Sequence, residues 1–561
     1  MLNPELVNAC YEALIDINEI NKMEVVKELE GSKFPTSTET FDLIVIGGGP
    51  GGYHAAIRAS QYGAKVAIIE KDHVGGTCLN RGCIPTKALY ASAKLLEDIE
   101  QKSKKFGIIL HDDPKVDFTQ VVENKNQLVR KMIGEIEQLL KRNDVELYPG
   151  FGSILGGDID SGFYVKIEGA EKTVIKGRRV IIATGSKPAL IPAFNIDHER
   201  ILTSDDILDP NFKTIPKRLL IIGGGVIGCE FGYIFSKLGS KVIILEYLES
   251  ILATEEKSIV KELKNKFKEM NIEIHENLNC LDVKNTGQRV EITSCSSKEN
   301  PDEIESAEKF NFTADYCLVS IGRAKYVKNL GLENTNIQIN QGQIEVNPTS
   351  LETDEPGIYA IGDVTGGLML AHVASYEGDV AVSNALESLN EFDIEPAMAT
   401  YDVVPTTIFT SPEIASVGLK EEIARLLGYK VFIGRFAYSA LGKAKCEGEE
   451  EGFLMIIADQ ETDEILGASC IGAEAPELIA EIALAINNNL TVEDITRTIH
   501  SHPTMSELVL EACEDVHGLS VHKARRRRKP EFVFKEISPE ILAAYIFPNY
   551  NFEAIFGNSN T

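Results

Sequence analysis

The sequence predicts an α/β fold made of two Rossmann-like dinucleotide-binding domains and a C-terminal α+β domain. A short apolar strand runs into a glycine turn and a helix at residues 41–59, and the same pattern recurs at residues 218–228. From about residue 396 onward, strands such as residues 453–457 are followed by a helix rich in alanine and isoleucine after Pro476. With 561 residues, the chain is long enough for three or four compact units.

The first glycine turn follows the strand at residues 41–46, and each of its glycines has a separate task. Gly47 allows the tight turn, Gly49 lets the backbone approach a pyrophosphate, and Gly52 lets the helix pack against the strand. The next strand ends in Glu70, where a carboxylate can accept hydrogen bonds from a ribose diol. An ordinary glycine turn is the alternative, but the strand context and the acid favour a nucleotide site.

A second copy of this device contains Gly223, Gly225 and Gly228, and the strand after it ends in Glu246. In both copies the acid lies 23 residues after the first glycine, a spacing that two unrelated turns would share only by accident. The sequence therefore predicts two bound dinucleotides. A carboxylate at position 246, with no arginine at residues 247–250, favours a free 2′-hydroxyl, so the second site is predicted to prefer NAD to NADP.

Two cysteines, Cys78 and Cys83, lie five residues apart just after the first nucleotide-binding unit. In an ideal helix their Cα atoms would be about 8.6 Å apart, too far for a disulfide, so the segment must bend, and Gly82 and Pro85 make a bend possible. A redox-active pair is one interpretation; two buried structural cysteines are another, and a zinc site has the wrong spacing. A flavin is the expected electron carrier between nicotinamide and a disulfide, which predicts FAD at the first site.

Composition and charge argue against several classes of function. The net charge of −29 disfavours a nucleic-acid or anionic-membrane partner. The other eight cysteines have no disulfide-framework spacing, which fits a reducing compartment. No apolar stretch reaches the roughly 18 residues of a membrane span, and the N-terminus carries acids where a signal peptide needs bases. We expect a cytoplasmic protein without a resident metal.

Taken together, the motifs resemble the flavin-dependent pyridine nucleotide-disulfide oxidoreductases over about residues 40–520, and most of all the members that oxidise dihydrolipoamide. Beyond the glycine turns and the cysteine segment, the resemblance rests on four more motifs, at residues 183–185, 360–364, 369–372 and 500–507. It implies that Cys83 is the thiolate facing the flavin and that Cys78 is the thiol that exchanges with the substrate. It also implies an ion pair of Lys87 with Glu230 beside the flavin ring.

The resemblance further implies that His502 is the general base for a dithiol, with Glu507 orienting its ring. His500 lies two residues earlier and is the alternative. In this family the histidine reaches the active site of the other subunit, so a homodimer is expected. The remaining cofactor-binding positions implied by the resemblance are Thr184, Gly185, Gly362, Asp363 and Ala371 for FAD and Gly322 on the NAD side.

The flavin domain is predicted to lie on both sides of the NAD domain in the sequence. Asp315–Arg323 is predicted as the strand that returns the chain to the flavin domain. An acidic helix in the N-terminal extension and a basic run at residues 523–529 fall outside the resemblance. The predicted parts are an N-terminal extension (1–39), the FAD-binding domain (40–186 and 314–395), the NAD-binding domain (187–313), the dimerisation domain (396–520) and a C-terminal extension (521–561).

The resemblance implies oxidation of protein-bound dihydrolipoamide to lipoamide with NAD, through a Cys78–Cys83 disulfide and FAD. The expected partner is the lipoyl-carrying protein of a 2-oxoacid dehydrogenase or glycine cleavage complex. Two alternatives stay open: an NADH-dependent reductase of another small disulfide, and a flavoprotein scaffold docked to a complex. Arg81 lies between the cysteines where relatives often have valine, and a cation there could lower a thiolate pKa or favour an acidic carrier.

Overall fold

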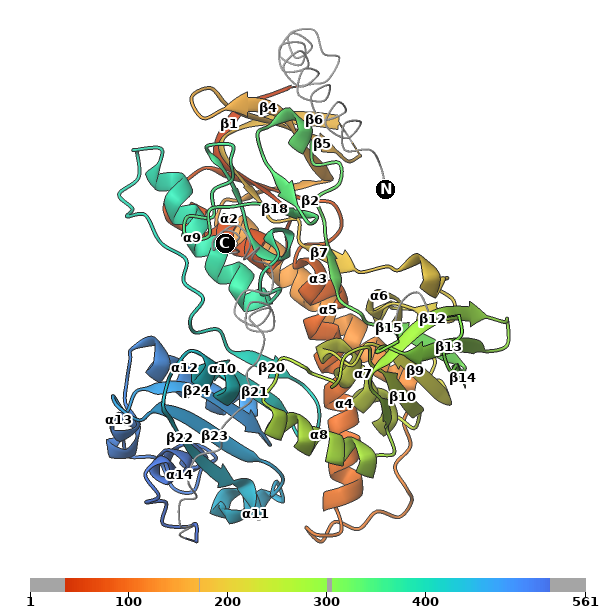
Figure 1. Ribbon diagram of the computed structural model, residues 1–561. Coiled ribbons are helices and arrows are strands. Elements are labelled where there is room, and N and C mark those ends of the chain that lie inside the picture. Colours follow the sequence, from red (N-terminus) through yellow and green to blue (C-terminus); the bar gives the residue numbers. More distant parts are fainter. Residues whose placement is uncertain (1–35, 171, 300–304, 525–561) are drawn as a thin grey trace, which may run out of the picture. The chain divides into compact units, whose positions relative to one another are not determined.

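The computed structural model describes residues 36–170, 172–299 and 305–524. They form two compact units, and each contains one of the glycine turns (Figure 1). The predicted acidic N-terminal helix and the arginines at 525–528 lie outside the described residues. The first unit consists of residues 36–85, 126–187 and 323–400, and the second of residues 86–125, 188–322 and 401–524.

A seven-stranded sheet forms the centre of the first unit. Its strands are β1 (Thr36–Ile46), β2 (Val66–Glu70), β3 (Glu146–Pro149), β4 (Phe151–Asp158), β5 (Gly162–Glu168), β6 (Lys172–Ile182) and β19 (Ile358–Ala360). The order is β3-β2-β1-β6-β5-β4, and β19 also pairs with β6. β1, β2, β3, β6 and β19 pair in parallel, whereas β4 and β5 are antiparallel to their neighbours.

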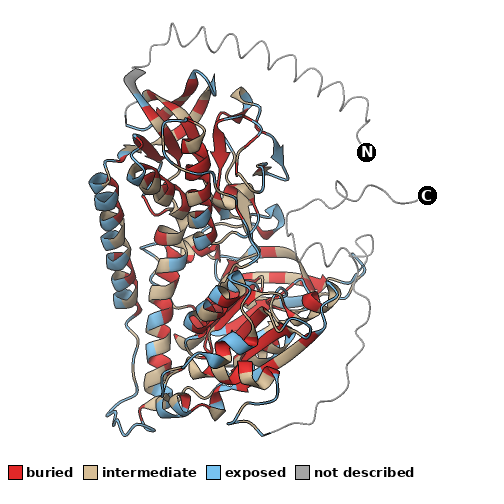
Figure 2. Cartoon of the chain, turned by 90° about the vertical axis from the view of Figure 1, so that its left-hand side faces the viewer, coloured by how far each residue is buried: buried red, intermediate tan, exposed pale blue. Residues whose placement is uncertain are grey.

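The strand β1 shows why its apolar run is continuous rather than alternating. Leu43 and Val45 pack into the core on one face of the sheet, and Ile44 and Ile46 pack into the core on the other. Both faces of this part of the sheet are therefore buried, as expected for parallel strands. Figure 2 shows buried residues concentrated along the strands. β1 begins at Thr36, which pairs with Val174, so this strand starts four residues before the predicted start of the FAD-binding domain at residue 40.

Helices of the first unit include α2 (Pro50–Gln61), α3 (Gly76–Arg81) and α9 (Ala371–Glu387). α2 and α9 lie side by side (Figure 1), and a Cβ on Gly51 would be only 2.9 Å from the carbonyl oxygen of Ala374. Smaller elements are η4 (Gly362–Thr365), η3 (Leu332–Asn334), the pair β17 (Ile339–Asn340) and β18 (Gln343–Ile344), and the pair β7 (Ser186–Pro188) and β16 (Arg323–Lys325). The predicted helix near residues 121–141 is α5 (Phe118–Arg142).

The second unit contains the second parallel sheet. Its strands are β8 (Ile201–Leu202), β9 (Arg218–Ile222), β10 (Lys241–Leu245), β11 (Glu273–His275) and β15 (Tyr316–Val319), in the order β11-β10-β9-β15-β8. Helices α6 (Ser204–Leu208), α7 (Val226–Lys237) and α8 (Lys257–Glu269) belong to this part, as does the antiparallel sheet of β12 (Leu278–Asn285), β13 (Val290–Ser296) and β14 (Phe310–Ala314).

The prediction that Asp315–Arg323 is the return strand of the flavin domain is wrong. β15 lies between β9 and β8 in the second sheet, and its partners are parallel on both sides. The strand that returns to the first sheet is β19. Both segments are short, apolar and buried, so each satisfies the side-chain pattern of either parallel sheet.

A third, antiparallel sheet belongs to the C-terminal part of the second unit. Its strands are β20 (Thr406–Ile408), β21 (Ile414–Gly418), β22 (Val431–Ala437), β23 (Phe453–Asp459) and β24 (Ile465–Ile471), in the order β20-β21-β24-β23-β22. Helices α12 (Ala475–Asn487), α13 (Val492–Arg497) and α14 (Glu507–Val516) pack on it, and α10 (Glu421–Leu426) and α11 (Gly442–Glu447) join its strands. The α/β fold with a C-terminal α+β part is thus confirmed.

The helix α4 (Cys83–Lys102) follows the cysteine segment, and its residues from Thr86 onward belong to the second unit. Tyr90 packs into the core of that unit, where its ring centroid is 5.6 Å from that of Tyr233. Glu97 is buried, accepts a 3.0 Å hydrogen bond from the Tyr233 hydroxyl and lies 2.7 Å from Lys237 Nζ. These buried polar contacts anchor α4 within the second unit.

Candidate active site

In the first glycine turn, side chains are sterically excluded at Gly47 and Gly52, as the sequence predicts. Gly47 has a φ of +109°, and a Cβ there would lie 2.3 Å from the carbonyl oxygen of Ala183. A Cβ on Gly52 would lie 1.8 Å from the carbonyl oxygen of Gly47. At Gly49, the N-cap of α2, the nearest atom to such a Cβ is Gly76 Cα at 3.9 Å. The N-terminus of α2 thus has room beside Gly49 for a diphosphate.

Glu70 ends β2 and is held in place by the backbone. Gly48 N donates to Oε2 at 2.6 Å, and Asp72 N donates to Oε1 at 2.8 Å. Burial raises the pKa of Glu70, while the hydrogen bond from Gly48 and the charges of Lys71 and Arg81 oppose this. Each carboxylate oxygen keeps acceptor capacity for a ribose hydroxyl. The residues therefore fit the adenosine half of FAD.

The second turn repeats this construction. Gly223 has a φ of +103°, and a Cβ on Gly228 would lie 2.0 Å from the carbonyl oxygen of Gly223. No atom lies within 4 Å of a Cβ on Gly225. Glu246 accepts from Gly224 N at 2.6 Å and from Leu248 N at 2.7 Å. The two turns thus share one geometry, and the residues of the second fit the adenosine half of a second dinucleotide.

Asp363 lies in η4, directly after β19. Ser186 Oγ donates to Asp363 Oδ2, and Arg323 Nε donates to Ser186 Oγ at 2.7 Å and lies 3.8 Å from the same carboxylate. Gly362 has a φ of +71°, and its N–H donates to Glu377 Oε2 at 2.6 Å. Sequence reasoning missed Ser186, Arg323 and Glu377. The only signal in the sequence is that Ser186 and Arg323 lie next to the predicted Gly185 and Gly322.

The other implied cofactor positions lie at turns and at a helix start. Thr184 Oγ1 donates to the carbonyl oxygen of Tyr326 at 2.8 Å. Gly185 and Gly322 have φ values of +69° and +119°, which favour glycine, and no atom lies within 4 Å of a Cβ on either. Ala371 is the first residue of α9. Their contacts to a cofactor stay predictions.

The cysteine segment bends at Gly82. α3 ends at Arg81, Gly82 has φ −149° and ψ −115°, and α4 begins at Cys83. A Cβ on Gly82 would lie 2.9 Å from the carbonyl oxygen of Thr77 and 3.3 Å from Cys78 Cα. The expected bend at Gly82 is confirmed, whereas Pro85 lies within the first turn of α4 without interrupting it. Cys78 is half-buried and Cys83 is exposed.

The predicted ion pair of Lys87 with Glu230 is present. Lys87 Nζ lies 2.9 Å from both carboxylate oxygens, and the Glu230 side chain is only 6% exposed. The backbone N–H of Phe409 donates to Glu230 Oε1 at 3.0 Å, and Lys87 Nζ lies 4.4 Å from the centre of the Phe409 ring. These contacts orient the Lys87 ammonium. Lys87 lies on α4, four residues or about one helical turn after Cys83.

His502 and His500 each contact a carboxylate, but their exposure differs. His502 Nδ1 lies 2.8 Å from Glu507 Oε1, and its side chain is 76% exposed. His500 Nε2 lies 3.1 Å from Glu481 Oε1, and its side chain is 5% exposed. Burial alone would raise the pKa of Glu507, but hydrogen bonds from His502 and the Thr504 amide hold that pKa below its ordinary value. Of these two histidines, His502 is therefore the one whose ring is open to solvent.

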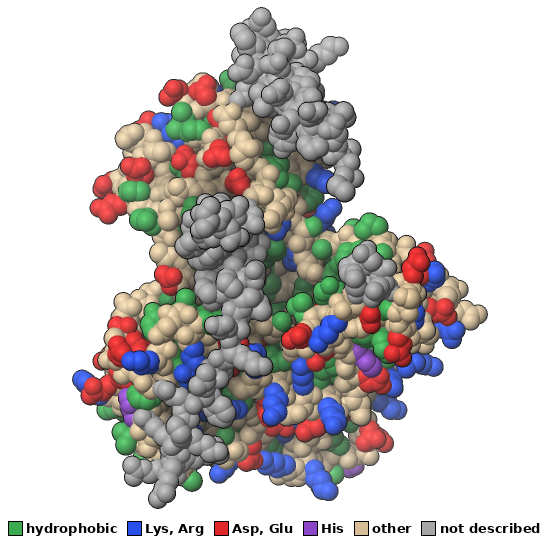
Figure 3. Space-filling model, viewed as in Figure 1, with side chains coloured by type: hydrophobic (Ala, Val, Ile, Leu, Met, Phe, Trp, Pro, Cys, Tyr) green, Lys and Arg blue, Asp and Glu red, His purple; other side chains and the backbone are tan. Residues whose placement is uncertain are grey.

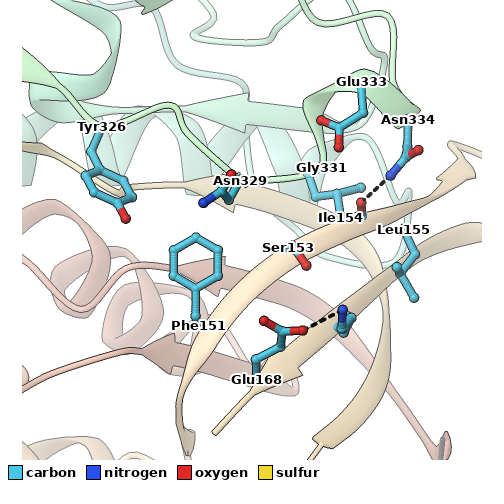
Figure 4. Close-up of a pocket in the computed structure, with 11 residues that line it drawn as sticks. Phe151, Ser153, Ile154, Leu155, Glu168, Tyr326, Asn329, Gly331, Glu333 and Asn334 are labelled. Carbon is cyan, nitrogen blue, oxygen red and sulfur yellow. Dashed lines mark hydrogen bonds and ion pairs between the residues drawn. The ribbon is translucent and has the colours of Figure 1, made fainter.

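A pocket of about 490 Å³ lies elsewhere in the first unit, beside β4, β5 and η3 (Figure 4). The Phe151 and Tyr326 rings stand on one side of it, 6.4 Å apart between centres, and Asn334 Nδ2 donates to the carbonyl oxygen of Ile154 at 2.9 Å. None of the predicted site residues lines this pocket. This pocket is therefore not part of the predicted active site.

Residues 41–378 match the family model for pyridine nucleotide-disulphide oxidoreductases, and residues 404–513 match that family's dimerisation domain. The chain belongs to the pyridine nucleotide-disulphide oxidoreductase family. The family implies FAD and NAD(P), and the dimerisation domain, which contains His502, implies a homodimer.

On the face shown in Figure 3, acidic and basic side chains lie interspersed. In the part of the chain that the structure describes, no helix could cross a membrane.

Relatives of this family member include two curated dihydrolipoyl dehydrogenases. That of Bacillus subtilis is 40% identical over 491 residues, which cover 86% of this chain and 99% of that protein. That of Chlamydia muridarum is 40% identical over 476 residues, covering 84% and 96%. The chain is therefore an oxidoreductase similar to dihydrolipoyl dehydrogenases.

Two solved structures share the fold. LpdA from Mycobacterium tuberculosis has a TM-score of 0.76 at 27% identity, covering 84% of this chain and 99% of that one. The HOCl-induced flavoprotein disulfide reductase RclA from Escherichia coli has a TM-score of 0.71 at 25% identity, covering 83% and 98%. The fold therefore also occurs in a flavoprotein disulfide reductase.

Proposed function

We propose that this chain oxidises protein-bound dihydrolipoamide to lipoamide with NAD. The observation that carries the proposal is its 40% identity to a dihydrolipoyl dehydrogenase over 99% of that protein's length. The bent cysteine segment, the second-site carboxylate at Glu246 and the exposed His502 agree with this chemistry. The lipoyl-carrying protein of a 2-oxoacid dehydrogenase or glycine cleavage complex is the proposed partner.

In the proposed reaction, Cys78 and Cys83 begin as a disulfide. One sulfur of the dithiol attacks the Cys78 sulfur, so a mixed disulfide forms and Cys83 leaves as a thiolate. The second substrate sulfur then attacks the first, which closes lipoamide and releases Cys78 as a thiol. Two electrons thereby pass from the substrate to the cysteine pair. Cys78 is half-buried and Cys83 is exposed, so exposure does not favour Cys78 as the substrate-facing sulfur, and the assignment of the two roles rests on the family resemblance.

His502 is proposed to take the proton of the attacking thiol, since only a thiolate attacks sulfur. Glu507 holds its ring by Nδ1, so Nε2 is the nitrogen that meets the dithiol. In the proposed homodimer this histidine serves the cysteines of the other subunit. The matched dimerisation domain, which includes both residues, supports this arrangement.

The two nucleotide sites have separate proposed tasks. FAD, held by the first glycine turn, Glu70 and the residues around Asp363, would supply a two-electron carrier between the cysteines and nicotinamide. Lys87, held by Glu230, would place a positive charge beside the flavin ring. Glu246 accepts two backbone hydrogen bonds, and its carboxylate would repel a 2′-phosphate, which favours NAD over NADP.

Anaerobic reduction tests the substrate assignment. The purified enzyme is mixed with dihydrolipoamide and the flavin absorbance is followed, and turnover is then assayed with NAD and dihydrolipoamide. We expect flavin reduction and NADH formation. In parallel, NADH or NADPH is supplied with glutathione disulfide. A flavin that dihydrolipoamide fails to reduce, together with rapid reduction of another disulfide, would instead support the reductase alternative, in line with the fold shared with RclA.

Cysteine variants test the proposed roles of the pair. Cys78→Ser and Cys83→Ser should each abolish turnover, and only Cys83→Ser should remove any long-wavelength absorbance that arises between thiolate and flavin. Cys446→Ser is a matched control, because Cys446 is also exposed but lies in α11. Retention of the band in Cys83→Ser would reverse the assignment of the two cysteines.

A further inference from the structure

The short helix α3, which carries Cys78, is tied back to the loop that precedes it. Arg81 Nη2 pairs with Asp72 Oδ2. Asn80 Nδ2 donates to the carbonyl oxygen of Gly76 at 2.8 Å and lies 3.2 Å from that of Val74. Both side chains come from the end of a six-residue helix, so they hold its last turn against the loop at residues 71–75.

That loop is itself fixed to the first nucleotide site. Asp72 N donates to Glu70 Oε1 at 2.8 Å, and Gly75 N donates to the carbonyl oxygen of Gly48 at 2.7 Å. The partner of Arg81 is thus two residues from the proposed ribose carboxylate and is hydrogen-bonded to it. Arg81 therefore links the cysteine helix to the rim of the nucleotide site.

The same contact argues against Arg81 as a docking cation for an acidic carrier. Asp72 neutralises its charge, and His73 Nε2 lies a further 3.8 Å from the Asp72 carboxylate. Arg81 and Asp72 are 42% and 43% exposed, so the pair is a surface ion pair. Such pairs contribute little to overall stability, and their loss acts mainly on local geometry.

We propose that Arg81 is a positioning residue for Cys78, which acts by tying α3 to Asp72. The proposal rests on the proposed role of Cys78 as the exchanging thiol. When either partner is removed, the last turn of α3 loosens and the half-buried Cys78 becomes more accessible. A purely electrostatic role would behave differently: loss of the cation would make the thiolate rarer, and loss of Asp72 would make it more abundant.

Thiol alkylation separates the two roles. The holoenzyme forms of wild type, Arg81→Gln, Asp72→Asn and the double variant are reduced anaerobically with dithionite. Their rates of Cys78 modification by iodoacetamide are measured across pH by tandem mass spectrometry. We expect both single variants to react about two- to fivefold faster, the range open to an exposed ion pair, and the double variant to react no faster than either.

The matched control is Arg58→Gln. Arg58 Nε lies 2.7 Å from Asp379 Oδ1, the two side chains are 37% and 42% exposed, and the pair joins α2 to α9 in the same unit. This variant should leave the Cys78 rate unchanged. Unfolding temperatures of all variants verify that the fold persists.

Opposite shifts in Arg81→Gln and Asp72→Asn, or rates equal to wild type, would overturn the positioning role. A salt-dependent rise in KM for the lipoyl carrier that occurs in Arg81→Gln and not in Asp72→Asn would also overturn the positioning role. Such a result would show that the carrier binds Arg81 directly. The alkylation readout needs no physiological substrate. If dihydrolipoamide does not reduce the wild-type flavin while both singles still react faster, the substrate assignment fails and the positioning role stands.

Discussion

His502 Nδ1 lies 2.8 Å from Glu507 Oε1, and the other oxygen of that carboxylate accepts the Thr504 amide at 3.0 Å. The pKa of Glu507 is held below its ordinary value, so the carboxylate is ionised at neutral pH and can only accept hydrogen bonds. Nδ1 must therefore carry the proton, and Nε2 presents its lone pair. The pair sets the tautomer that a general base needs.

Glu507→Gln should lower kcat with dihydrolipoamide by about tenfold or more, part of the 10²- to 10⁴-fold that a positioned base supplies. The deficit should shrink as pH falls through the lowered pKa of Glu507, because the wild-type carboxylate is then also neutral. Stopped-flow flavin reduction across pH measures this. Glu481→Gln, which alters the buried His500 pair instead, should leave the rate unchanged. Equal losses in both variants would contradict the assignment of His502.

Glu246→Ala should reduce the preference for NAD over NADP, measured as the ratio of the two kcat/KM values. We expect a fall of about tenfold or more, since a hydrogen bond to a charged group contributes about 1.5–3 kcal/mol. Glu273→Gln is the control, because Glu273 pairs with Lys241 in the same sheet and is 44% exposed. An unchanged ratio in Glu246→Ala would mean that another residue selects the cofactor.

Gly52→Ala should yield protein that does not retain FAD. The added Cβ would lie 1.8 Å from the Gly47 carbonyl oxygen, so the turn at the N-terminus of α2 must open. Gly134→Ala is the matched glycine change, in α5, where no atom lies within 4 Å of the new Cβ. It should stabilise the protein by about 0.5–1 kcal/mol through helix propensity. Flavin absorbance after gel filtration and denaturant unfolding measure the two effects.

Lys125 predicts a pH dependence of stability. It is buried on α5, and its ammonium donates to the carbonyl oxygen of Leu208. Burial lowers its pKa from 10.5 to about 8. Between these values the unfolded chain binds more protons than the folded one, so folding gains stability as pH rises from about 8 to 10.5.

We therefore expect the unfolding free energy of wild type, relative to Lys125→Met, to increase over that pH range. Denaturant unfolding at several pH values measures the difference. Lys131→Met removes a lysine that is 74% exposed on the same helix, and its curve should stay parallel to wild type. Parallel curves for Lys125→Met as well would show that Lys125 titrates normally.

Local sequence patterns were sufficient to predict those features of the site that depend on residues close together in the chain. The glycine turns, with Glu70 and Glu246 at a fixed spacing, and the bend at Gly82 could all be predicted from residue types, because steric limits at glycine act over a few residues. Partners far apart in the chain could not. Arg323 and Glu377 stabilise Ser186 and Gly362 across the first unit, and no spacing rule relates these positions.

The sequence by itself determined the two dinucleotide folds, the cysteine pair with its bend, and the acids at the end of β2 and directly after β10, since each is encoded within one strand-turn-helix segment. Only the tertiary structure decided to which sheet β15 and β19 belong, because a buried apolar strand suits either parallel sheet. It also decided that Arg81 is paired with Asp72 and that His502 is exposed while His500 is buried. Charge pairing and burial depend on the path of the whole chain, which residue types alone do not specify.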